Sequence, residues 1–404
     1  MRNVEDFKGG ADVVVVGGGV AGLAAARELA RGGASVVVVE RGRIGAEASW
    51  AAGGMLAPQA EADGRDEFFD LLSASRDLYP AFAEALHEET GIDIELERTG
   101  TLYLALTTED AEEVERRFEW QARARLPVER LTAEEARALE PSVSPRVRLA
   151  LRFPLDWQVE NRRLVAALAA SIEKQGGRLL TGTEALGVRV EAGRAVGVET
   201  SRGTVWAGAV LLAAGAWASH LPILGDSRRE PGGGATVSEH PRIEPVRGQM
   251  LCFAENAALS SPFRHVIYSP RGYVVPRRDG RLLAGSTTEH VGYDKRVTCG
   301  GVHAITGHAL EIAPDLDRLV LLDSWAGLRP RAADERPVLG ASADVRNLFY
   351  ATGFYRNGIL LAPLSGEATA ALIIGGKARG FPARALESFS PERFGSAFAA
   401  AHAE

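Results

Sequence analysis

The hydrophobic pattern is most regular at the start of the chain. Valine fills positions 13–16 and 36–39, and such unbroken β-branched runs predict central parallel strands covered on both faces. Between the two runs, good helix formers continue to about Arg31, where Gly32 and Gly33 end the helix. The chain therefore opens as strand, turn, helix and strand.

Apolar residues recur at helical or strand-like spacing along the rest of the chain. Helical spacing predicts helices at 66–90, 108–125, 161–174 and 300–314, and a helix of small residues that begins within 357–363 and ends near 374. Alternating or continuous apolar positions predict strands at 178–180, 185–191, 195–200, 209–214, 250–253, 273–276, 282–284 and 348–351, and two strands within 92–106. Thr132, with Glu135 three residues later, forms a capping box that predicts one more helix.

The order of these elements predicts an α/β fold, a Rossmann-like domain into which a largely antiparallel α+β domain is inserted. The Rossmann-like domain is expected to comprise residues 1–90, 150–225 and 325–404, and the inserted domain residues 91–149 and 226–324. The glycine run in Pro231–Gly234 follows no predicted strand and opens no helix. It is therefore interpreted as a surface loop and not as a second phosphate-binding turn.

Three glycines at G-x-G-x-x-G spacing join the first strand to the first helix. Gly17 permits a tight turn, Gly19 lets the backbone approach a pyrophosphate, and Gly22 lets helix and sheet pack closely. Glu40 ends the second strand, where an acidic side chain can accept hydrogen bonds from ribose hydroxyls. The glycines alone are compatible with a merely glycine-rich turn, but strand, helix and acid together predict a dinucleotide site.

Two further stretches are rich in small residues, which let a backbone lie against a planar ligand. Residues 41–58 are compatible with that role or with a flexible loop. The strand at 209–214 runs directly into Gly215 and Trp217, so its end is either a second cofactor contact or an ordinary strand end.

Composition narrows the class of protein without identifying it. The 404 residues are enough for two or three domains, and a net charge of −7 without a basic tract makes nucleic acid and anionic membranes poor candidate partners. Cys252 and Cys299 cannot form a disulfide framework, so we expect a reduced, cytoplasmic protein with structural cysteines. Residues 1–10 show no signal-peptide pattern, and the eight histidines form no metal-binding motif.

Five stretches together carry a resemblance to a known family. They are the glycine motif, residues 49–58 with A-A-G-G-M-L at 51–56, the strand end A-G-A-W at 214–217, W-A-G-L-R-P at 325–330, and residues 354–363 with R-N-G-I-L-L-A-P at 356–363. Over nearly its whole length the chain resembles the D-amino-acid oxidase family, and within it the glycine-oxidising branch of thiamine biosynthesis. The resemblance implies an extended FAD whose flavin ring lies between an FAD-binding domain, the Rossmann-like one, and an inserted substrate-binding domain.

The resemblance also implies which positions contact the cofactor. Residues 17–22 are expected at the pyrophosphate, 40–41 at the ribose and Val188 at the adenine. Residues 215–217 are expected at the ribityl chain, and residues 49–55 and 353–360 at the flavin. The implied set is Gly17, Gly19, Val20, Ala21, Gly22, Glu40, Arg41, Ser49, Ala51, Ala52, Gly53, Gly54, Met55, Val188, Ala214, Gly215, Trp217, Gly353, Arg356, Asn357, Gly358, Ile359 and Leu360.

On the substrate side, the resemblance implies Tyr273, Arg329 and Arg356 as catalytic-site residues. Arg329 lies in a semi-apolar stretch and suits a guanidinium that holds a carboxylate by two parallel hydrogen bonds; the alternative is a structural salt bridge to Asp334 or Glu335. Tyr273 either donates to the same carboxylate or is a core tyrosine. Arg356 either contacts substrate or orders the flavin loop.

The implied activity is oxidation of glycine, sarcosine or small D-amino acids, with hydride transfer from Cα to flavin N5, imine and hydrogen peroxide as products, and O₂ as acceptor. The imine would serve the thiazole of thiamine. The resemblance also implies a homo-oligomer. Three alternatives share some or all of the motifs: a dehydrogenase that uses a quinone or protein carrier, a flavin-binding subunit without turnover, and an NAD(P)-linked enzyme.

Two departures from the family pattern matter for these expectations. Arg271 stands where some glycine oxidases have a histidine, and its charge either changes the substrate range or points to solvent. The sarcosine oxidase branch attaches its flavin to a cysteine after the Arg329 block, but residues 331–336 contain none. Non-covalent FAD is therefore expected.

Overall fold

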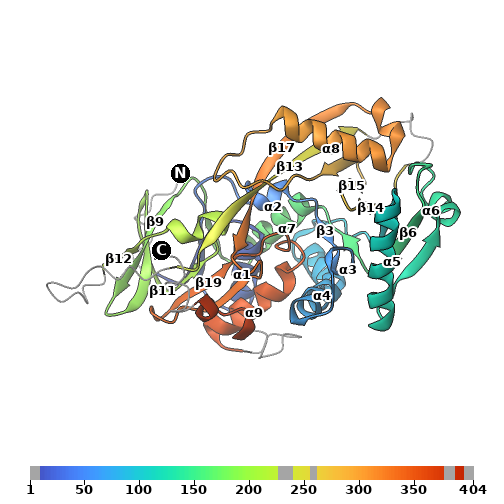
Figure 1. The fold of residues 1–404 in the computed structure, drawn as a ribbon. Coiled ribbons are helices and arrows are strands. Elements are labelled where there is room, and N and C mark those ends of the chain that lie inside the picture. Colours follow the sequence, from blue (N-terminus) through green and yellow to red (C-terminus); the bar gives the residue numbers. More distant parts are fainter. Residues whose placement is uncertain (1–9, 226–239, 255–261, 377–386, 395–404) are drawn as a thin grey trace, which may run out of the picture.

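Two large β-sheets carry the fold in the computed structural model, which describes residues 10–225, 240–254, 262–376 and 387–394 (Figure 1). The strands of the first sheet are β1 (Ala11–Val16), β2 (Val36–Val39), β8 (Arg178–Leu180), β9 (Ala185–Glu191), β10 (Arg194–Thr200), β11 (Gly203–Leu212), β12 (Ile223–Leu224), β18 (Val338–Ala341) and β19 (Leu348–Thr352). Their order is β12-β9-β10-β11-β1-β2-β8, with β19 beside β11 and β18 beside β19.

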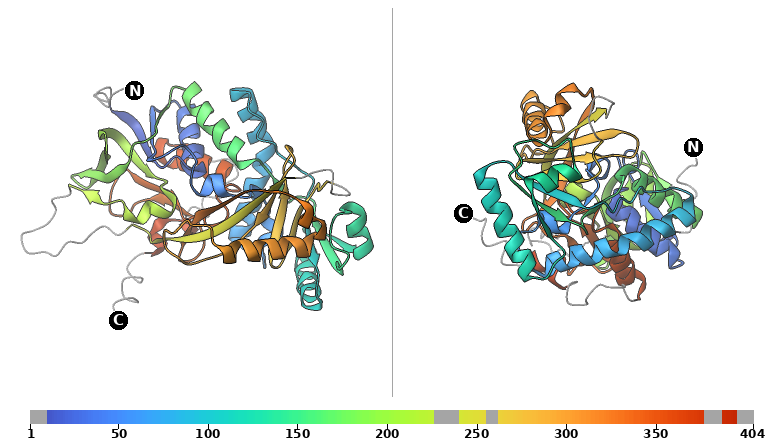
Figure 2. Two further views of the ribbon diagram at one scale, coloured as in Figure 1. Left: turned by 90° about the horizontal axis from the view of Figure 1, so that it is seen from above. Right: turned by 90° about the vertical axis from the view of Figure 1, so that its right-hand side faces the viewer.

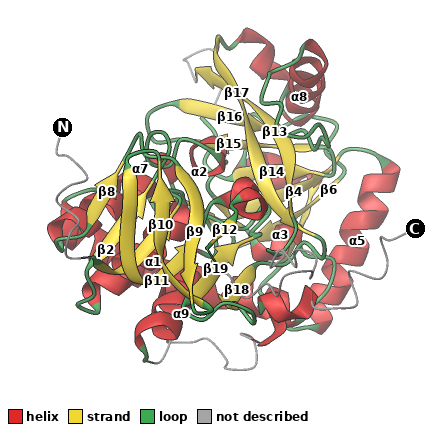
Figure 3. Ribbon diagram, turned by 90° about the vertical axis from the view of Figure 1, so that its left-hand side faces the viewer, coloured by secondary structure: helices red, strands yellow, loops and turns green. Residues whose placement is uncertain are grey.

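The centre of the first sheet is parallel. β1 pairs in parallel with β2 and β11, and Val13–Val16 lie in register with Val36–Val39. Both faces are covered, because alternate valines enter two different apolar clusters. The helices that cover one face are α1 (Val20–Arg31), α4 (Glu67–Thr90), α7 (Asn161–Lys174) and α9 (Ala362–Ile374) (Figure 3). The predicted Rossmann-like arrangement is confirmed.

Segments from opposite ends of the chain meet in this layer. The first and last long helices, α1 and α9, lie side by side, blue against red in Figure 2. A Cβ atom on Gly366 would lie 2.9 Å from the backbone of Ala24, so only glycine permits this approach. The C-terminal segment therefore completes the layer that the N-terminal segment begins.

The second sheet is antiparallel except for one pair. Its strands are β4 (Thr101–Ala105), β5 (Glu129–Thr132), β6 (Leu149–Phe153), β13 (Ile243–Ala254), β14 (Val266–Ser269), β15 (Gly272–Pro276), β16 (Arg281–Gly285) and β17 (Leu321–Ala332). The order is β17-β13-β16-β15-β14-β4-β6-β5, and only β14 and β4 pair in parallel. The helices of this part are α5 (Thr108–Arg123), α6 (Ala133–Leu139) and α8 (Cys299–Ile312). Thr132 caps α6 in the predicted capping box.

Alternation along the strands gives the second sheet two different faces. Leu251 and Val274 pack with α8 in one cluster, whereas Met250, Val275 and Tyr273 belong to the cluster on the opposite face. That opposite face also contacts α2 (Ala48–Ala51), α3 (Pro58–Glu61) and the short pair β3 (Met55–Leu56) and β7 (Trp157–Gln158). The second sheet therefore presents one face to the glycine-rich segment near residue 50.

Two expectations from the sequence differ from the structure. The first strand expected in 92–106 does not form, because Glu95 adopts a φ of 55° and its N–H donates to the side chain of Asp93. The domain boundary expected at residue 325 falls inside β17, which pairs with β13 along its length. The last long helix begins at Ala362, within the range predicted for its start, after the turns of 355–361. The loop predicted at Pro231–Gly234 lies outside the described residues.

None of the helices that the structure describes is both long and apolar enough to cross a membrane.

Candidate active site

One cavity of about 820 Å³ runs from the start of α1 to the inner face of the second sheet. The predicted site residues that line it are Gly17, Gly19, Val20, Ala21, Glu40, Arg41, Ser49, Ala51, Ala52, Gly53, Gly54, Met55, Ala214, Gly215, Trp217, Tyr273, Arg329, Arg356, Asn357, Gly358, Ile359 and Leu360. Residues from seven separate parts of the sequence therefore meet around one space.

Three predicted residues do not line the cavity. Gly22 faces the opposite way, and its Cα lies against the turn at Gly17. Val188 is fully buried in β9, and its N–H donates to the Pro222 carbonyl over 2.8 Å, while Pro222 itself lines the cavity. Gly353 packs against apolar side chains of β17 and β18. Gly22, Val188 and Gly353 therefore pack behind the residues that line the cavity.

The nucleotide end is a backbone cradle. Gly17 has a φ of 112°, and a Cβ atom there would lie 2.4 Å from the Ala213 carbonyl oxygen. A Cβ atom on Gly19 would meet only the Ser49 hydroxyl, at 3.4 Å, so the space beside Gly19 is otherwise open. The Glu40 carboxylate accepts from the Gly18 N–H at 2.9 Å, which ties the turn to the end of β2. The start of α1, whose first N–H groups lack partners within the helix, thus points into open space suited to an anion.

The side chains of Arg41 and Trp217 extend this end of the cavity. The guanidinium of Arg41 lies 3.8 Å from the ring centre of Trp217 and pairs with Glu47 at 2.8 Å. Trp217 belongs to a 3₁₀ helix, Gly215–His220, that follows β11 directly. The strand end near Gly215 is therefore a part of the cavity wall.

The glycine-rich segment of residues 49–55 is fixed in place by three side chains. Asn161 donates to the Ser49 carbonyl at 2.7 Å, and Arg277 donates to the Gly53 carbonyl at 2.8 Å. The indole of Trp325 donates to the Ala51 carbonyl at 3.1 Å. The backbone conformation of residues 49–55 is thus set by the start of α7 and by the second sheet, which favours the predicted ligand-facing role over the flexible loop.

The opposite wall is the turn before α9. Tyr79 donates to the Ile359 carbonyl, and Ser75 donates to the Leu360 carbonyl at 2.7 Å. The Leu361 N–H donates to Asn357 at 2.8 Å. Two side chains of α4 therefore hold this turn against the cavity.

Tyr273 lies where the two walls approach each other. Its ring is within 3.6 Å of a Cβ position on Gly53, and its hydroxyl donates to the Met250 sulfur at 3.3 Å. Burial raises the pKa of Tyr273, and this effect exceeds the lowering by the positive charge of Arg329. The hydroxyl therefore stays protonated at neutral pH. Because a thioether is a weak acceptor, this donor can readily turn to a better one.

Arg329 points from β17 across Gly248 into the cavity. Its guanidinium donates to the Ser286 hydroxyl at 2.7 Å and to the Thr287 carbonyl at 3.1 Å. Among the described residues no carboxylate lies within ion-pair distance of Arg329, because Asp334 pairs with Arg393 and Glu335 with Arg331. The structural salt bridge considered from the sequence is therefore absent from the described part of the chain.

Arg356 occupies the far side of the same space. Its Nε lies 3.7 Å from a Glu61 oxygen, and Tyr268 donates to the other oxygen of Glu61 at 2.8 Å. The Glu61 carboxylate raises the pKa of Arg356. Tyr268 lies 5.4 Å from Tyr273, centre to centre. Glu61 and Tyr268 were not predicted, because a short helix and an isolated strand residue carry no motif.

Arg271 neither leaves its charge free nor points to solvent. It donates to both oxygens of Asp110 at 2.9 and 3.0 Å and to Glu311 at 2.8 Å. Burial alone would raise the pKa of Asp110, but the hydrogen bonds from Arg271 and two backbone N–H groups lower it to about 2. The added positive charge is thus neutralised at the wall of the cavity.

We expect Asp110→Asn to destabilise the protein at neutral pH. Because the pKa of Asp110 is lowered, its ionised carboxylate stabilises the folded protein at pH values above the ordinary pKa of 3.8. This stabilisation is lost as the pH falls toward about 2. The loss in unfolding free energy at pH 7 should be about 2 kcal/mol. Urea unfolding of both proteins at pH 7 and pH 3 measures it, with Glu311→Gln as the more exposed control. A difference that stayed constant down to pH 2.5 would contradict the assignment.

The comparisons with known proteins agree with this geometry. The family model for DAO, described as FAD dependent oxidoreductase, matches residues 12–372. The chain belongs to this family. It is therefore an FAD-dependent oxidoreductase, and the Rossmann-like fold predicted from the sequence is that of its relatives.

Three relatives illustrate the range of the family around this chain. It is 37% identical to the glycine oxidase of Geobacillus kaustophilus, over 90% of this chain and 92% of the relative. The solved structure of glycine oxidase from G. kaustophilus superposes with a TM-score of 0.85 at 36% identity, covering 95% and 98% of the two chains. Identity to the Pseudomonas aeruginosa glycine oxidase is 38%, over 90% and 94%. The Synechocystis bifunctional protein ThiO/ThiG is 33% identical over 95% of this chain but 54% of its own length.

The cavity fits the cofactor of this family. The cradle at Gly17 and Gly19 is open on the side where a side chain would obstruct a pyrophosphate, and residues 49–55, with carbonyls fixed by Arg277 and Trp325, line another part of the cavity. No group of three or more histidine, cysteine or acidic residues suited to a metal ion occurs within the described ranges.

Proposed function

We propose that this protein oxidises glycine and other small amines or amino acids, such as sarcosine and small D-amino acids, to the imine, with reduction of O₂ to hydrogen peroxide. The observation that carries the proposal is the guanidinium of Arg329. It projects into the cavity without a carboxylate partner among the described residues, on the same face as the Tyr273 hydroxyl. The names of the relatives support glycine as substrate.

The proposed roles follow from the geometry of the donors. Arg329 can offer two parallel N–H groups to a carboxylate while its remaining bonds to Ser286 and Thr287 hold it in place. Tyr273, released from Met250, can donate to the same carboxylate. Bound FAD would supply the acceptor at flavin N5 for the hydride that leaves Cα. Arg329 and Tyr273 therefore orient the substrate and need to exchange no proton with it.

The remaining expectations belong to the same proposal. FAD is bound without a covalent link by the predicted cofactor set, between an FAD-binding and a substrate-binding domain. The two domains are divided as predicted, except that the whole of β17 belongs to the substrate-binding domain. The subunits associate as a homo-oligomer. The name of the ThiO/ThiG relative supports a role of the imine in thiamine thiazole synthesis.

The test begins with the absorption spectrum of the purified protein. We expect a flavin spectrum that acid precipitation releases into the supernatant, bleaching of this spectrum by glycine without air, and stoichiometric peroxide in air. Sarcosine and D-alanine rank the substrates. Bleaching by glycine without oxygen uptake would replace the oxidase by a dehydrogenase, and a flavin that none of the three amines bleaches would indicate a subunit without turnover.

A further inference from the structure

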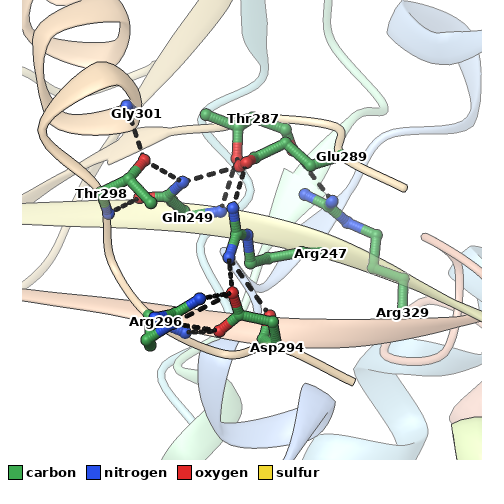
Figure 4. Close-up of polar contacts among 9 residues, drawn as sticks. All are labelled: Arg247, Gln249, Thr287, Glu289, Asp294, Arg296, Thr298, Gly301 and Arg329. Atoms are coloured by element: carbon green, nitrogen blue, oxygen red, sulfur yellow. Dashed lines mark hydrogen bonds and ion pairs between the residues drawn. The ribbon is translucent and has the colours of Figure 1, made fainter. Parts of the chain in front are cut away.

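The contacts of Arg329 come from a segment that is itself anchored at one point. Ser286 and Thr287 follow β16 directly, and they supply the two acceptors for the guanidinium. Figure 4 shows the contact with Thr287. The Gly248 backbone lies beneath Arg329, since a Cβ atom on Gly248 would come within 2.2 Å of a guanidinium nitrogen. The Arg329 guanidinium therefore packs on the Gly248 backbone and donates to two acceptors. The orientation of the guanidinium depends on the positions of residues 286 and 287.

Glu289 holds that segment to β13. Its carboxylate accepts from the Thr287 hydroxyl, from Arg247 and, at 2.7 Å, from the Gln249 side chain (Figure 4). The backbone of Glu289 also pairs with Arg247 in both directions, at 2.9 and 3.0 Å. One carboxylate thus connects the residue next to Ser286 with two side chains of the strand that pairs with β17.

The contacts of Glu289 are largely buried and involve full charges. Arg247 is only 4% exposed, so its ion pair with Glu289 is shielded from solvent. Burial opposes the charge of Glu289, but hydrogen bonds from Arg247, Thr287 and Gln249 lower its pKa to about 2. Gln249 in turn accepts from the Thr298 N–H at 2.9 Å, and Thr298 caps α8. The network therefore links β13, the segment after β16 and the start of α8.

We propose that Glu289 is a positioning residue for substrate binding. The Glu289 carboxylate fixes Thr287 through its hydroxyl, and the Thr287 carbonyl fixes the Arg329 guanidinium. The affinity for the substrate carboxylate depends on this connection. The proposal rests on the proposed function, because it takes Arg329 as the carboxylate-binding group. Since Glu289 acts only on the direction of Arg329, its removal is expected to weaken binding while the limiting rate of flavin reduction remains within about twofold.

A double-mutant cycle tests the connection. The proteins are the wild type, Glu289→Gln, Arg329→Ala and the double variant, each as purified with its flavin. Acetate, a carboxylate of the size of glycine without an amine, is titrated against the flavin absorption spectrum, and KM for glycine is measured in parallel. Asp294→Asn is the matched control, since Asp294 is also half-buried and pairs with the same Arg247, at 3.3 Å, but its other ion-pair partner is Arg296.

We expect Glu289→Gln to weaken acetate binding and raise KM by about tenfold, as expected for one hydrogen bond to a charged group. In the Arg329→Ala background the same change should have no further effect, and Asp294→Asn should stay within about twofold of wild type. Equal losses from Glu289→Gln with and without Arg329 would overturn the inference and leave the proposed function intact. Unchanged acetate binding in Arg329→Ala would instead overturn the proposed function, and the inference with it.

A milder variant covers the case in which Glu289→Gln does not fold. Thr287→Val removes the hydroxyl that Glu289 accepts from but leaves the carbonyl that Arg329 donates to. Its expected loss is about threefold, and it too should vanish without Arg329. A loss that persists in the Arg329→Ala background would contradict the connection through Thr287.

Discussion

Replacement of Arg329 by alanine is expected to lower kcat/KM for glycine by roughly a hundredfold. Truncation of one partner of a desolvated, hydrogen-bonded charge pair costs about 2–5 kcal/mol, and about 3 kcal/mol corresponds to this factor. The loss should appear mainly in KM, because Arg329 is proposed to bind the carboxylate both before and during the reaction. Steady-state oxygen uptake with glycine measures it.

Two variants make this result interpretable. Arg329→Lys keeps the charge but not the planar fork, so it should lie between wild type and alanine. Arg331→Ala changes the next arginine on β17, whose partners are the exposed Glu335 and Glu244, and should leave both constants unchanged. If Arg329→Ala bound and oxidised glycine as the wild type does, the carboxylate would have to be assigned to another cation, with Arg356 as the next candidate.

The second large effect is expected from Gly22→Ala. A Cβ atom at this position would lie 2.2 Å from the Gly17 carbonyl oxygen and 3.1 Å from the Ala213 side chain. The first contact is backbone that cannot rotate away, so α1 must separate from the turn that forms the cradle. We expect a loss of about 1–3 kcal/mol in unfolding free energy, and a protein that purifies largely without flavin.

The ratio of flavin to protein absorbance and thermal unfolding measure both parts of this expectation. Gly307→Ala is the control, since Gly307 lies on an exposed position of α8 with no atom within 4 Å of its Cβ position. It should raise stability by about 0.5–1 kcal/mol through helix propensity alone, and keep its flavin. A flavin content in Gly22→Ala equal to that of the control would show that the close packing at the turn is dispensable.

Local patterns predicted most of the elements. The valine runs became β1 and β2, and the capping box at Thr132 opens α6, because burial on both faces and side-chain capping are determined by neighbours in sequence. The strand expected at the start of 92–106 failed for a local reason as well. The turn between Asp93 and Glu95 competes with extended backbone, and alternating apolar residues do not reveal it.

The candidate site divides in the same way. The resemblance implied the positions of the cofactor set, and 20 of these residues line one cavity together with Tyr273 and Arg329. Val188 was placed at the adenine by resemblance, whereas the structure puts it behind Pro222. The surroundings of Arg271 could not be predicted, since Asp110 lies 161 positions away from it. Sequence distance of this size carries no signal about which charges meet.

By itself, therefore, the sequence determined the elements, the turn at Gly17 and the chemical types available to a site, because these depend on spacing within a few residues. Only the tertiary structure decided what surrounds Arg329. Strand periodicity says that Trp325, Gly327 and Arg329 share a face, but pairing of β17 with β13 and of β13 with β16 brings Ser286 and Thr287 to its guanidinium. That pairing is a property of the whole sheet, so the connection to Glu289 became visible only in the folded chain.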